Sequence, residues 1–113
     1  MVLENDSGWI VASALARPAA GAGTRLTIDF IWHPDYVKEA SDLVLDLIRW
    51  AEESTGRSCE MLVAQEDEWK RLEAARFGFR YMGRTGVLFD LNGRKLALER
   101  FVRDRRSEAS LSK

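Results

Sequence analysis

The chain has 113 residues, of which 46% are hydrophobic and 31% are charged, and its formal net charge is −1. This composition indicates one globular domain with a modest core, and it argues against intrinsic disorder and against a strongly basic nucleic-acid-binding protein. Apolar runs are shorter than the ~20 residues of a membrane span, and Met1–Ser7 lacks the features of a signal peptide. We therefore expect a cytoplasmic protein with neither a membrane nor a nucleic-acid partner.

Cysteine and histidine usage limits the chemistry. The single cysteine, Cys59, excludes an internal disulfide framework. One cysteine and one histidine fall short of the about four ligands of a common zinc site, so we expect no metal. Since the sequence places no base near Cys59, a structural thiol is favoured over a nucleophile.

Charge is distributed unevenly along the chain. Residues 1–56 hold nine acidic and four basic residues, a net charge of −5. Residues 57–113 hold nine acidic and thirteen basic residues, a net charge of +4. We interpret the basic excess as solvated surface in preference to a phosphate-binding patch.

The first half predicts a β-hairpin followed by a long helix. Trp9–Arg17 and Thr24–Trp32 have strand-like composition, and Pro18–Gly23 between them is typical of a turn or flexible loop. Tyr36–Thr55 has the apolar spacing of a helix with one buried face, and Gly56 is placed to cap its C-terminus. The predicted buried positions are Val37, Ala40, Val44, Leu47, Ile48 and Ala51.

The second half predicts a strand, a short helix and a second hairpin. The strand is Cys59–Ala64 and the helix is Glu68–Phe77, which ends at Gly78. The expected inner face of this helix holds Trp69, Leu72, Ala75 and the stem of Arg76. Two further strands, Arg80–Leu91 and Lys95–Val102, flank Asn92-Gly93, a strong hairpin signal.

The predicted element order is β-β-α-β-α-β-β. This order indicates an α/β (α+β) chain in which a mixed sheet carries helices. Neither an internal repeat nor a second domain is evident, so we expect one domain over residues 1–102. Residues 103–113 are polar, charged and rich in serine, and we expect them to form a flexible tail.

Three stretches resemble the GNAT superfamily of acyl-CoA-dependent N-acyltransferases. They are Ile28–Tyr36 (IDFIWHPDY), the amphipathic helix directly after it, and the run from Asp67 through Phe77-Gly-Phe79 to Arg84. The resemblance covers Gly8 to Val102. It implies a GNAT-like fold truncated at the N-terminus, which begins at the family's third strand. It also implies transfer of an acetyl group from acetyl-CoA to an amine.

The resemblance also implies a site. Asp29 lies where many family members carry the base that deprotonates the amine, although an ordinary surface carboxylate is the competing interpretation. His33 has the chemistry of a base, but a His-Pro pair at a strand end is more typical of a turn. The competing role of Trp32 is a core or interface aromatic. The implied CoA wall consists of Phe30, Ile31, Trp32, Lys38, Ala40 and Ser41.

The sequence departs from the family at the CoA loop and at the last helix. Val37–Asp42 lacks both glycines of the family's Arg/Gln-x-x-Gly-x-Gly/Ala loop, and its two carboxylates repel a phosphate that Lys38 alone attracts. Ala74 stands where many members have the tyrosine that protonates the CoA thiolate. Asp67 stands where they have the asparagine that holds the pantetheine. Tyr81 lies beyond the Gly-Phe turn and is not assigned the tyrosine's role.

Three functions therefore remain open. The first is an acyl-CoA-dependent N-acetyltransferase, and the second is a GNAT-like binding or interaction module with reduced or no catalysis. The third is a small α+β interaction domain that shares only the element order. The missing acceptor wall and the four tryptophans predict a homodimer or docking on a second domain.

Overall fold

The computed structural model describes residues 1–18, 25–89 and 91–103. The predicted loop from residue 19 on and the predicted tail from residue 104 on lie outside these described residues. The chain divides into two compact units, Met1–Cys59 and Glu60–Lys113. Strands and two α-helices alternate along it, which confirms the predicted α/β composition.

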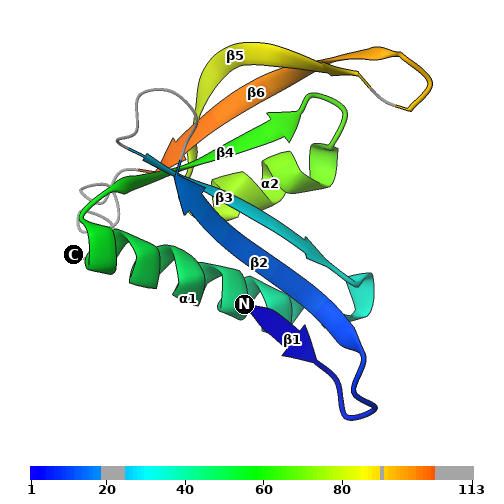
Figure 1. Ribbon diagram of the computed structural model, residues 1–113, viewed down its shortest axis with the longest axis vertical. Coiled ribbons are helices and arrows are strands. Elements are labelled where there is room, and N and C mark those ends of the chain that lie inside the picture. The colour runs from blue at the N-terminus through cyan, green and yellow to red at the C-terminus, as the bar shows by residue number, and fades with distance from the viewer. Residues whose placement is uncertain (19–24, 90, 104–113) are drawn as a thin grey trace. The chain divides into compact units, whose positions relative to one another are not determined.

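The first unit contains an antiparallel sheet in the order β1-β2-β3 (Figure 1). β2 (Ile10–Pro18) and β3 (Arg25–Trp32) form the predicted hairpin, with Ala14 opposite Phe30. β1 (Val2–Glu4) was not predicted, because three residues are too few to show a period.

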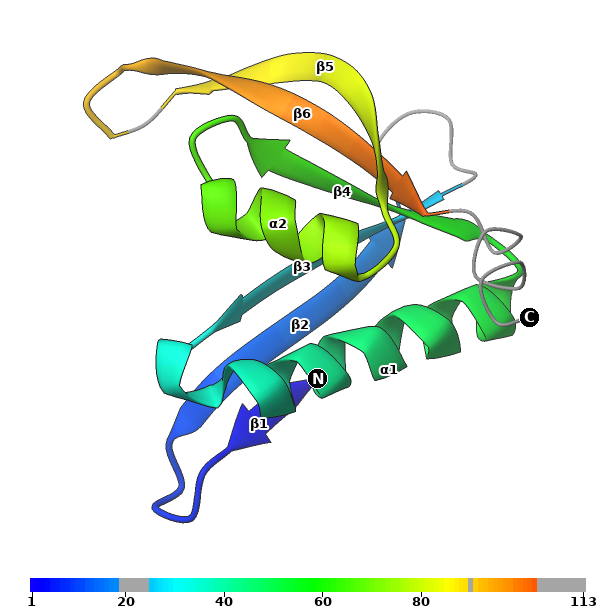
Figure 2. The ribbon, with the colours of Figure 1, turned by 180° about the vertical axis from the view of Figure 1, so that it is seen from behind.

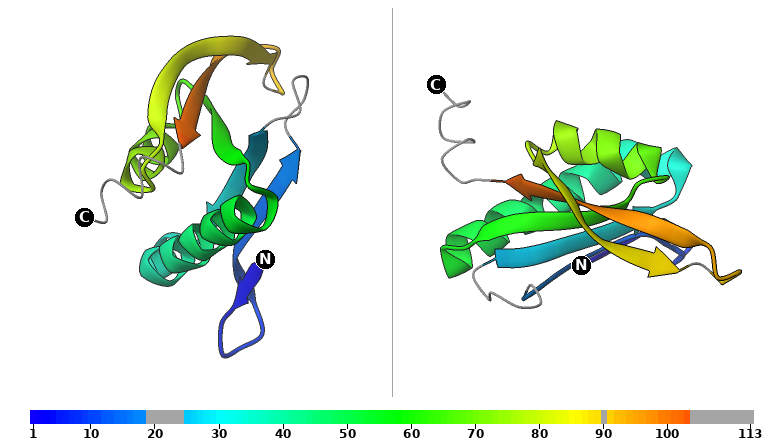
Figure 3. Two further views of the ribbon diagram at one scale, coloured as in Figure 1. Left: turned by 90° about the vertical axis from the view of Figure 1, so that its left-hand side faces the viewer. Right: turned by 90° about the horizontal axis from the view of Figure 1, so that it is seen from above.

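Helix α1 (Val37–Thr55) covers one face of β2 and β3 (Figure 3). It follows a short 3-10 helix, η1 (Pro34–Tyr36). The predicted apolar stripe is confirmed, since five of its six residues are buried and Val37 is half-buried. Gly56 ends the helix at φ +68°, a value that glycine adopts without a Cβ penalty, and its N–H bonds the Glu52 carbonyl at 2.9 Å.

The second unit contains β4 (Ser58–Ala64), α2 (Glu68–Arg76), β5 (Arg80–Phe89) and β6 (Lys95–Arg103). The first two residues of β4 belong to the first unit. The strand order of the second unit is β4-β6-β5. The predicted second hairpin is confirmed: β5 and β6 pair antiparallel and form a long ribbon (Figure 2). The last strand includes Arg103, one residue beyond the predicted domain boundary.

The predicted inner face of α2 was wrong. Trp69 and Ala75 are exposed, and Leu72 is 62% exposed. The fully buried residue of the helix is Ala74 instead, and Phe77, directly after the helix, is also buried. The Nε of Arg71 lies 3.2 Å from Oε1 of Glu99, so this side of the helix faces β6.

Among the described residues of the second unit, two carboxylates are buried, Glu60 and Glu99. Each lies beside an arginine: Glu60 Oε2 is 3.2 Å from the Nε of Arg100, and Glu99 Oε1 is 3.2 Å from the Nε of Arg71. Pairing offsets the cost of removing these charges from water. Strand β6 is therefore tied to both β4 and α2 by ion pairs.

Cys59 is fully buried, which agrees with the expected structural thiol. Neither α-helix of the described ranges has the length and apolar character needed to cross a bilayer. The described residues also hold no group of three or more histidine, cysteine or acidic side chains arranged for a metal ion.

Candidate functional site

The predicted CoA wall lies within the first unit, where β3 ends and α1 begins. Phe30 points towards α1 and is 3% exposed, whereas Ile31 points to the opposite face and is 65% exposed. The ring of Trp32 stacks on Phe30, with centroids 4.8 Å apart and planes 17° apart. Strand alternation thus divides the three residues between two faces, and only their backbone forms a continuous wall.

Asp29 lies on the same face as Ile31. It is exposed between the buried residues Ile28 and Phe30, as the alternation predicts. Its Oδ1 accepts a hydrogen bond from the backbone N–H of Phe30 at 2.9 Å. A carboxylate in this position can accept a proton from an amine or from water, provided that the amine reaches this face.

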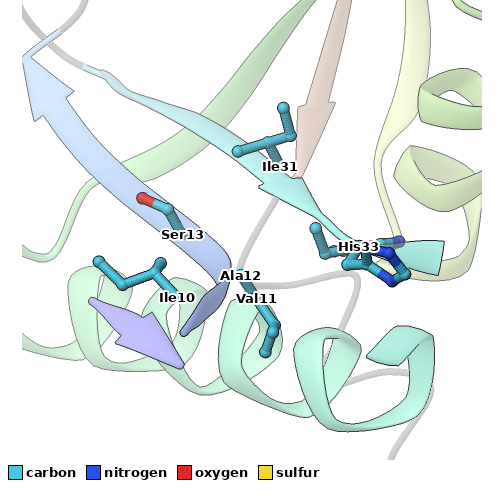
Figure 4. Close-up of a pocket in the computed structure, with 7 residues that line it drawn as sticks. Ile10, Val11, Ala12, Ser13, Ile31 and His33 are labelled. Atoms are coloured by element: carbon cyan, nitrogen blue, oxygen red, sulfur yellow. The ribbon is translucent and has the colours of Figure 1, made fainter. Parts of the chain in front are cut away.

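A shallow hollow of about 300 Å³ lies beside the end of β3. In Figure 4, Ile31 and Ser13 project from neighbouring strands, and the register places them opposite each other. The hollow brings together two wall residues and His33, but Asp29 does not line it. It is lined by Ile10, Val11, Ala12, Ser13, Ile31, Trp32 and His33.

His33 stabilises the turn that leads into α1. Its Nδ1 accepts a hydrogen bond from the backbone N–H of Asp35 at 3.1 Å, which caps η1. Its ring lies edge-on to Tyr36, with centroids 6.0 Å apart. The favoured interpretation of His33 as a turn residue is confirmed, and only Nε2 is left for other chemistry.

The first turns of α1 combine features that attract and repel an anion. The N-cap residue Tyr36 makes no side-chain capping bond. Lys38 is exposed, and Ala40 is fully buried. The hydroxyl of Ser41 is buried without a hydrogen-bond partner among the described residues. Glu39 is exposed in the first turn, where its charge opposes a phosphate.

These turns fit an acyl-CoA through some of their groups. The positive end of the helix dipole and its N–H groups suit a pyrophosphate, and the Ser41 hydroxyl, which has no hydrogen-bond partner among the described residues, lies buried beneath the surface of these turns. The carboxylates of Glu39 and Asp42 weaken that fit by like-charge repulsion. The start of α1 therefore offers N–H donors that suit a pyrophosphate, but its two carboxylates oppose the negative charge of that group.

Ala74 and Tyr81 are the two residues to compare with the tyrosine that protonates the CoA thiolate in many GNAT proteins. Ala74 is fully buried in α2 and has no group that can donate a proton. In the second unit, a hydrogen bond to the Glu99 carboxylate raises the pKa of Tyr81, with burial as the next cause. Nothing in the sequence pattern indicates that bond, because it depends on the pairing of β5 with β6.

The sequence also missed Ile10 and Ser13 as lining residues. Both are on β2, outside the stretches that carry the family resemblance at the CoA site. The hairpin register supplies the signal, because Ser13 pairs with Ile31 and Ala12 with Trp32. The sequence alone does not predict these pairs, because neither strand carries a pattern that fixes its register against the other.

Neither a protein-family model nor a curated protein matches the sequence. Solved acetyltransferase structures do match the fold. A variant of spermidine N-acetyltransferase SpeG from Vibrio cholerae gives a TM-score of 0.79 at 15% identity, over 99% of this chain and 68% of its own. A dodecameric structure of that enzyme gives a TM-score of 0.78 at 16% identity, and the match covers 99% of this chain and 67% of the SpeG chain.

A third match is a structure solved as a "Probable acetyltransferase". It gives a TM-score of 0.74 at 18% identity, over 88% of this chain and 57% of its own. At these identities the similarity establishes the fold. The chain therefore has the fold of these N-acetyltransferases, which confirms the predicted GNAT-like fold.

Proposed function

We propose that this protein binds an acyl-CoA, with acetyl-CoA as the leading candidate, and is an N-acetyltransferase-related protein of reduced activity. The observation that carries the proposal is the fold: a spermidine N-acetyltransferase matches 99% of the chain at a TM-score of 0.79. The chemistry of the residues at the β3–α1 junction supports the same function.

Six residues would hold the acyl-CoA. The backbone of Phe30, Ile31 and Trp32 would run beside the pantetheine arm. Lys38 would approach the phosphates, together with the backbone at Ala40 and the hydroxyl of Ser41, which has no hydrogen-bond partner among the described residues. The bound thioester supplies an activated acyl group.

Asp29 would accept the proton that the attacking amine loses, directly or through a water molecule. Its exposure suits this role, since an amine can approach from solvent. Ala74 leaves the departing thiolate without the family's proton donor. General acid catalysis contributes roughly 10²- to 10⁴-fold, and a thiolate leaves more readily than an alkoxide, so the loss slows transfer without abolishing it.

A non-catalytic binding module is the second candidate. The specific observations that favour it are the buried methyl group of Ala74 and the carboxylates of Glu39 and Asp42 near the phosphate position. In that case the protein uses the fold to bind a ligand or another protein, and Asp29 is a surface residue without a catalytic role.

The protein is also proposed to act in the cytoplasm as a homo-oligomer or docked on a second domain. SpeG from Vibrio cholerae forms a dodecamer, so a relative in fold assembles from copies of itself. The match covers 67% of that protein's length.

The test is a titration of acetyl-CoA and free CoA at low salt, followed by tryptophan fluorescence. Trp32 lies in the proposed wall, and Trp9 is exposed on the preceding segment. We expect saturable binding whose signal is reduced in Trp32→Phe and kept in the matched control Trp9→Phe. Absence of binding at millimolar concentration overturns the proposal.

Turnover separates the two candidates. CoA thiol release is measured with a panel of primary amines, including polyamines. Slow release that falls in Asp29→Asn, with acetyl-CoA affinity unchanged, supports the transferase. Binding without release from any amine in the panel, and with the same result in Asp29→Asn, supports the non-catalytic module.

A further inference from the structure

A second apolar hollow, of about 290 Å³, lies in the first unit where α1 faces β2. Trp50 is 60% exposed and Leu15 is 54% exposed, so the hollow opens to the surface. Exposed tryptophan beside other large apolar side chains is typical of a contact surface. We call this the Trp50 surface; it is lined by Met1, Ala14, Leu15, Ala16, Leu47 and Trp50.

Acidic side chains flank the Trp50 surface. Asp46 and Glu53 lie four residues before and three residues after Trp50 on α1, so all three share one side of the helix. Both carboxylates are exposed. Glu39 and Asp42 add two more exposed acids to the same helix, so its four exposed acids outnumber its two exposed bases, Lys38 and Arg49.

The β5–β6 hairpin of the second unit carries the complementary chemistry. Four apolar side chains of this hairpin are exposed: Tyr81, Met82, Val87 and Leu91. Together with the exposed basic residues of the hairpin, they form what we call the hairpin surface. The exposed basic residues of its described part are Arg80, Arg84, Arg94 and Lys95, whereas Arg100 is half-buried and Arg103 is buried. Arg94 pairs with Glu66 at 2.7 Å, which leaves three of these exposed bases outside that pair.

The charges of the two units follow the same division. By sequence, Met1–Cys59 holds nine acidic and five basic residues, a net charge of −4. Glu60–Lys113 holds nine acidic and twelve basic residues, a net charge of +3. Two copies of this chain therefore attract most strongly when the first unit of one meets the second unit of the other.

We propose that the Trp50 surface of one copy receives the hairpin surface of a second copy of this chain. An apolar side chain of the hairpin packs against Trp50 and Leu15, and the arginines Arg80 and Arg84 pair with the acids that flank the hollow. The inference is independent of the acyl-CoA proposal, because none of these residues belongs to the predicted CoA wall.

The contact is heterologous, since it joins two different surfaces. Each copy carries both surfaces, so two copies can exchange two such contacts in a closed dimer, or further copies can join until a larger ring closes. The ionic part is screened by salt, with a Debye length of about 10 Å at 0.1 M. Assembly is therefore expected to grow with protein concentration and to weaken as salt is added.

Light scattering after size-exclusion chromatography tests the proposal with two charge-reversed proteins. One carries Asp46→Lys and Glu53→Lys, and the other carries Arg80→Glu and Arg84→Glu. We expect each alone to be monomeric and an equimolar mixture to associate again, because the mixture contains one unchanged pair of surfaces and one pair whose charges are exchanged. Trp50→Ala should weaken self-association of the otherwise unchanged chain roughly tenfold or more.

The control variant is Trp9→Ala, which removes another exposed tryptophan outside the Trp50 surface. Far-ultraviolet circular dichroism confirms that each variant folds. The proposal is overturned if the unchanged protein is monomeric at all concentrations, if the two reversed proteins keep its oligomeric state, or if their mixture stays monomeric.

Discussion

The guanidinium of Arg103, at the end of β6, donates a buried hydrogen bond to the carbonyl oxygen of Phe77, directly after α2. This bond satisfies one of the last carbonyls of the helix and places a positive charge at its negative end. Arg103→Ala should lower the free energy of unfolding by about 2 kcal/mol. Urea denaturation followed by circular dichroism measures the change.

The matched control for that loss is Arg94→Ala. Arg94 and Glu66 form an ion pair in which both side chains are more than half exposed, so its removal should cost less than about 0.5 kcal/mol. Equal losses for Arg103→Ala and Arg94→Ala would show that the buried bond has no special weight.

Two isoleucines of β3 test which face of the strand is buried. Ile28 is 2% exposed, whereas Ile31 lies on the opposite face and is largely exposed. Ile28→Ala should lower the free energy of unfolding by about 2–5 kcal/mol, because it removes buried methyl groups and leaves a cavity. Ile31→Ala should cost less than about 0.5 kcal/mol. Thermal and urea unfolding of the pair give the answer, and the reverse ranking would contradict the register of β3.

Tyr81 predicts a pH dependence on the alkaline side. Its raised pKa, caused chiefly by the hydrogen bond to Glu99, means that the folded state favours the protonated phenol. The associated stability is present below the ordinary tyrosine pKa of about 10 and is lost as the pH rises through the folded-state value. Tyr81→Phe should therefore remove this alkaline loss.

Phenolate absorbance measures the Tyr81 pKa directly, since the chain has only one other tyrosine, Tyr36. A Tyr36→Phe background leaves Tyr81 as the single signal. In that background Glu99→Gln should lower the pKa, because it replaces the charged acceptor. An unchanged titration would exclude Glu99 as the cause.

Neutralising the acids at the start of α1 should strengthen acyl-CoA binding. Glu39→Gln and Asp42→Asn remove charges that oppose a phosphate at a helix N-terminus, where each interaction is worth about 0.3–1 kcal/mol. The expected gain is roughly two- to fivefold in affinity for each variant. Glu53→Gln, at the other end of the helix, is the control. Calorimetric titration that shows equal affinities for all variants would place the phosphates elsewhere.

Long, periodic elements were predictable from the sequence. The stripe of α1 repeats over five turns, and Gly56 supplies a stop signal with a physical basis, so both the helix and its end were predicted correctly. The Asn92-Gly93 hairpin depends on local backbone preferences alone, and for that reason it was also found.

Features set by long-range pairing were not predictable. The side of α2 that faces β6 carries Arg71, which forms an ion pair with Glu99, a residue far away in the sequence. A sequence pattern also predicts that charged residues such as Glu60 are exposed. Glu60 is buried, because its carboxylate forms an ion pair with Arg100. At the candidate site, the side chains facing Ile31 follow from the register of β2 against β3.

The two interruptions in the pairing of β5 with β6 bear on aggregation. The register shifts between Tyr81 and Arg84 and again between Arg84 and Gly86, and Gly83 adopts φ +99°. Strand β5 ends the strand order of its unit, and irregularities of this kind bend an edge strand and disrupt its row of hydrogen-bonding groups. The ribbon is thereby a poor template for cross-β stacking, even though it carries several exposed apolar side chains.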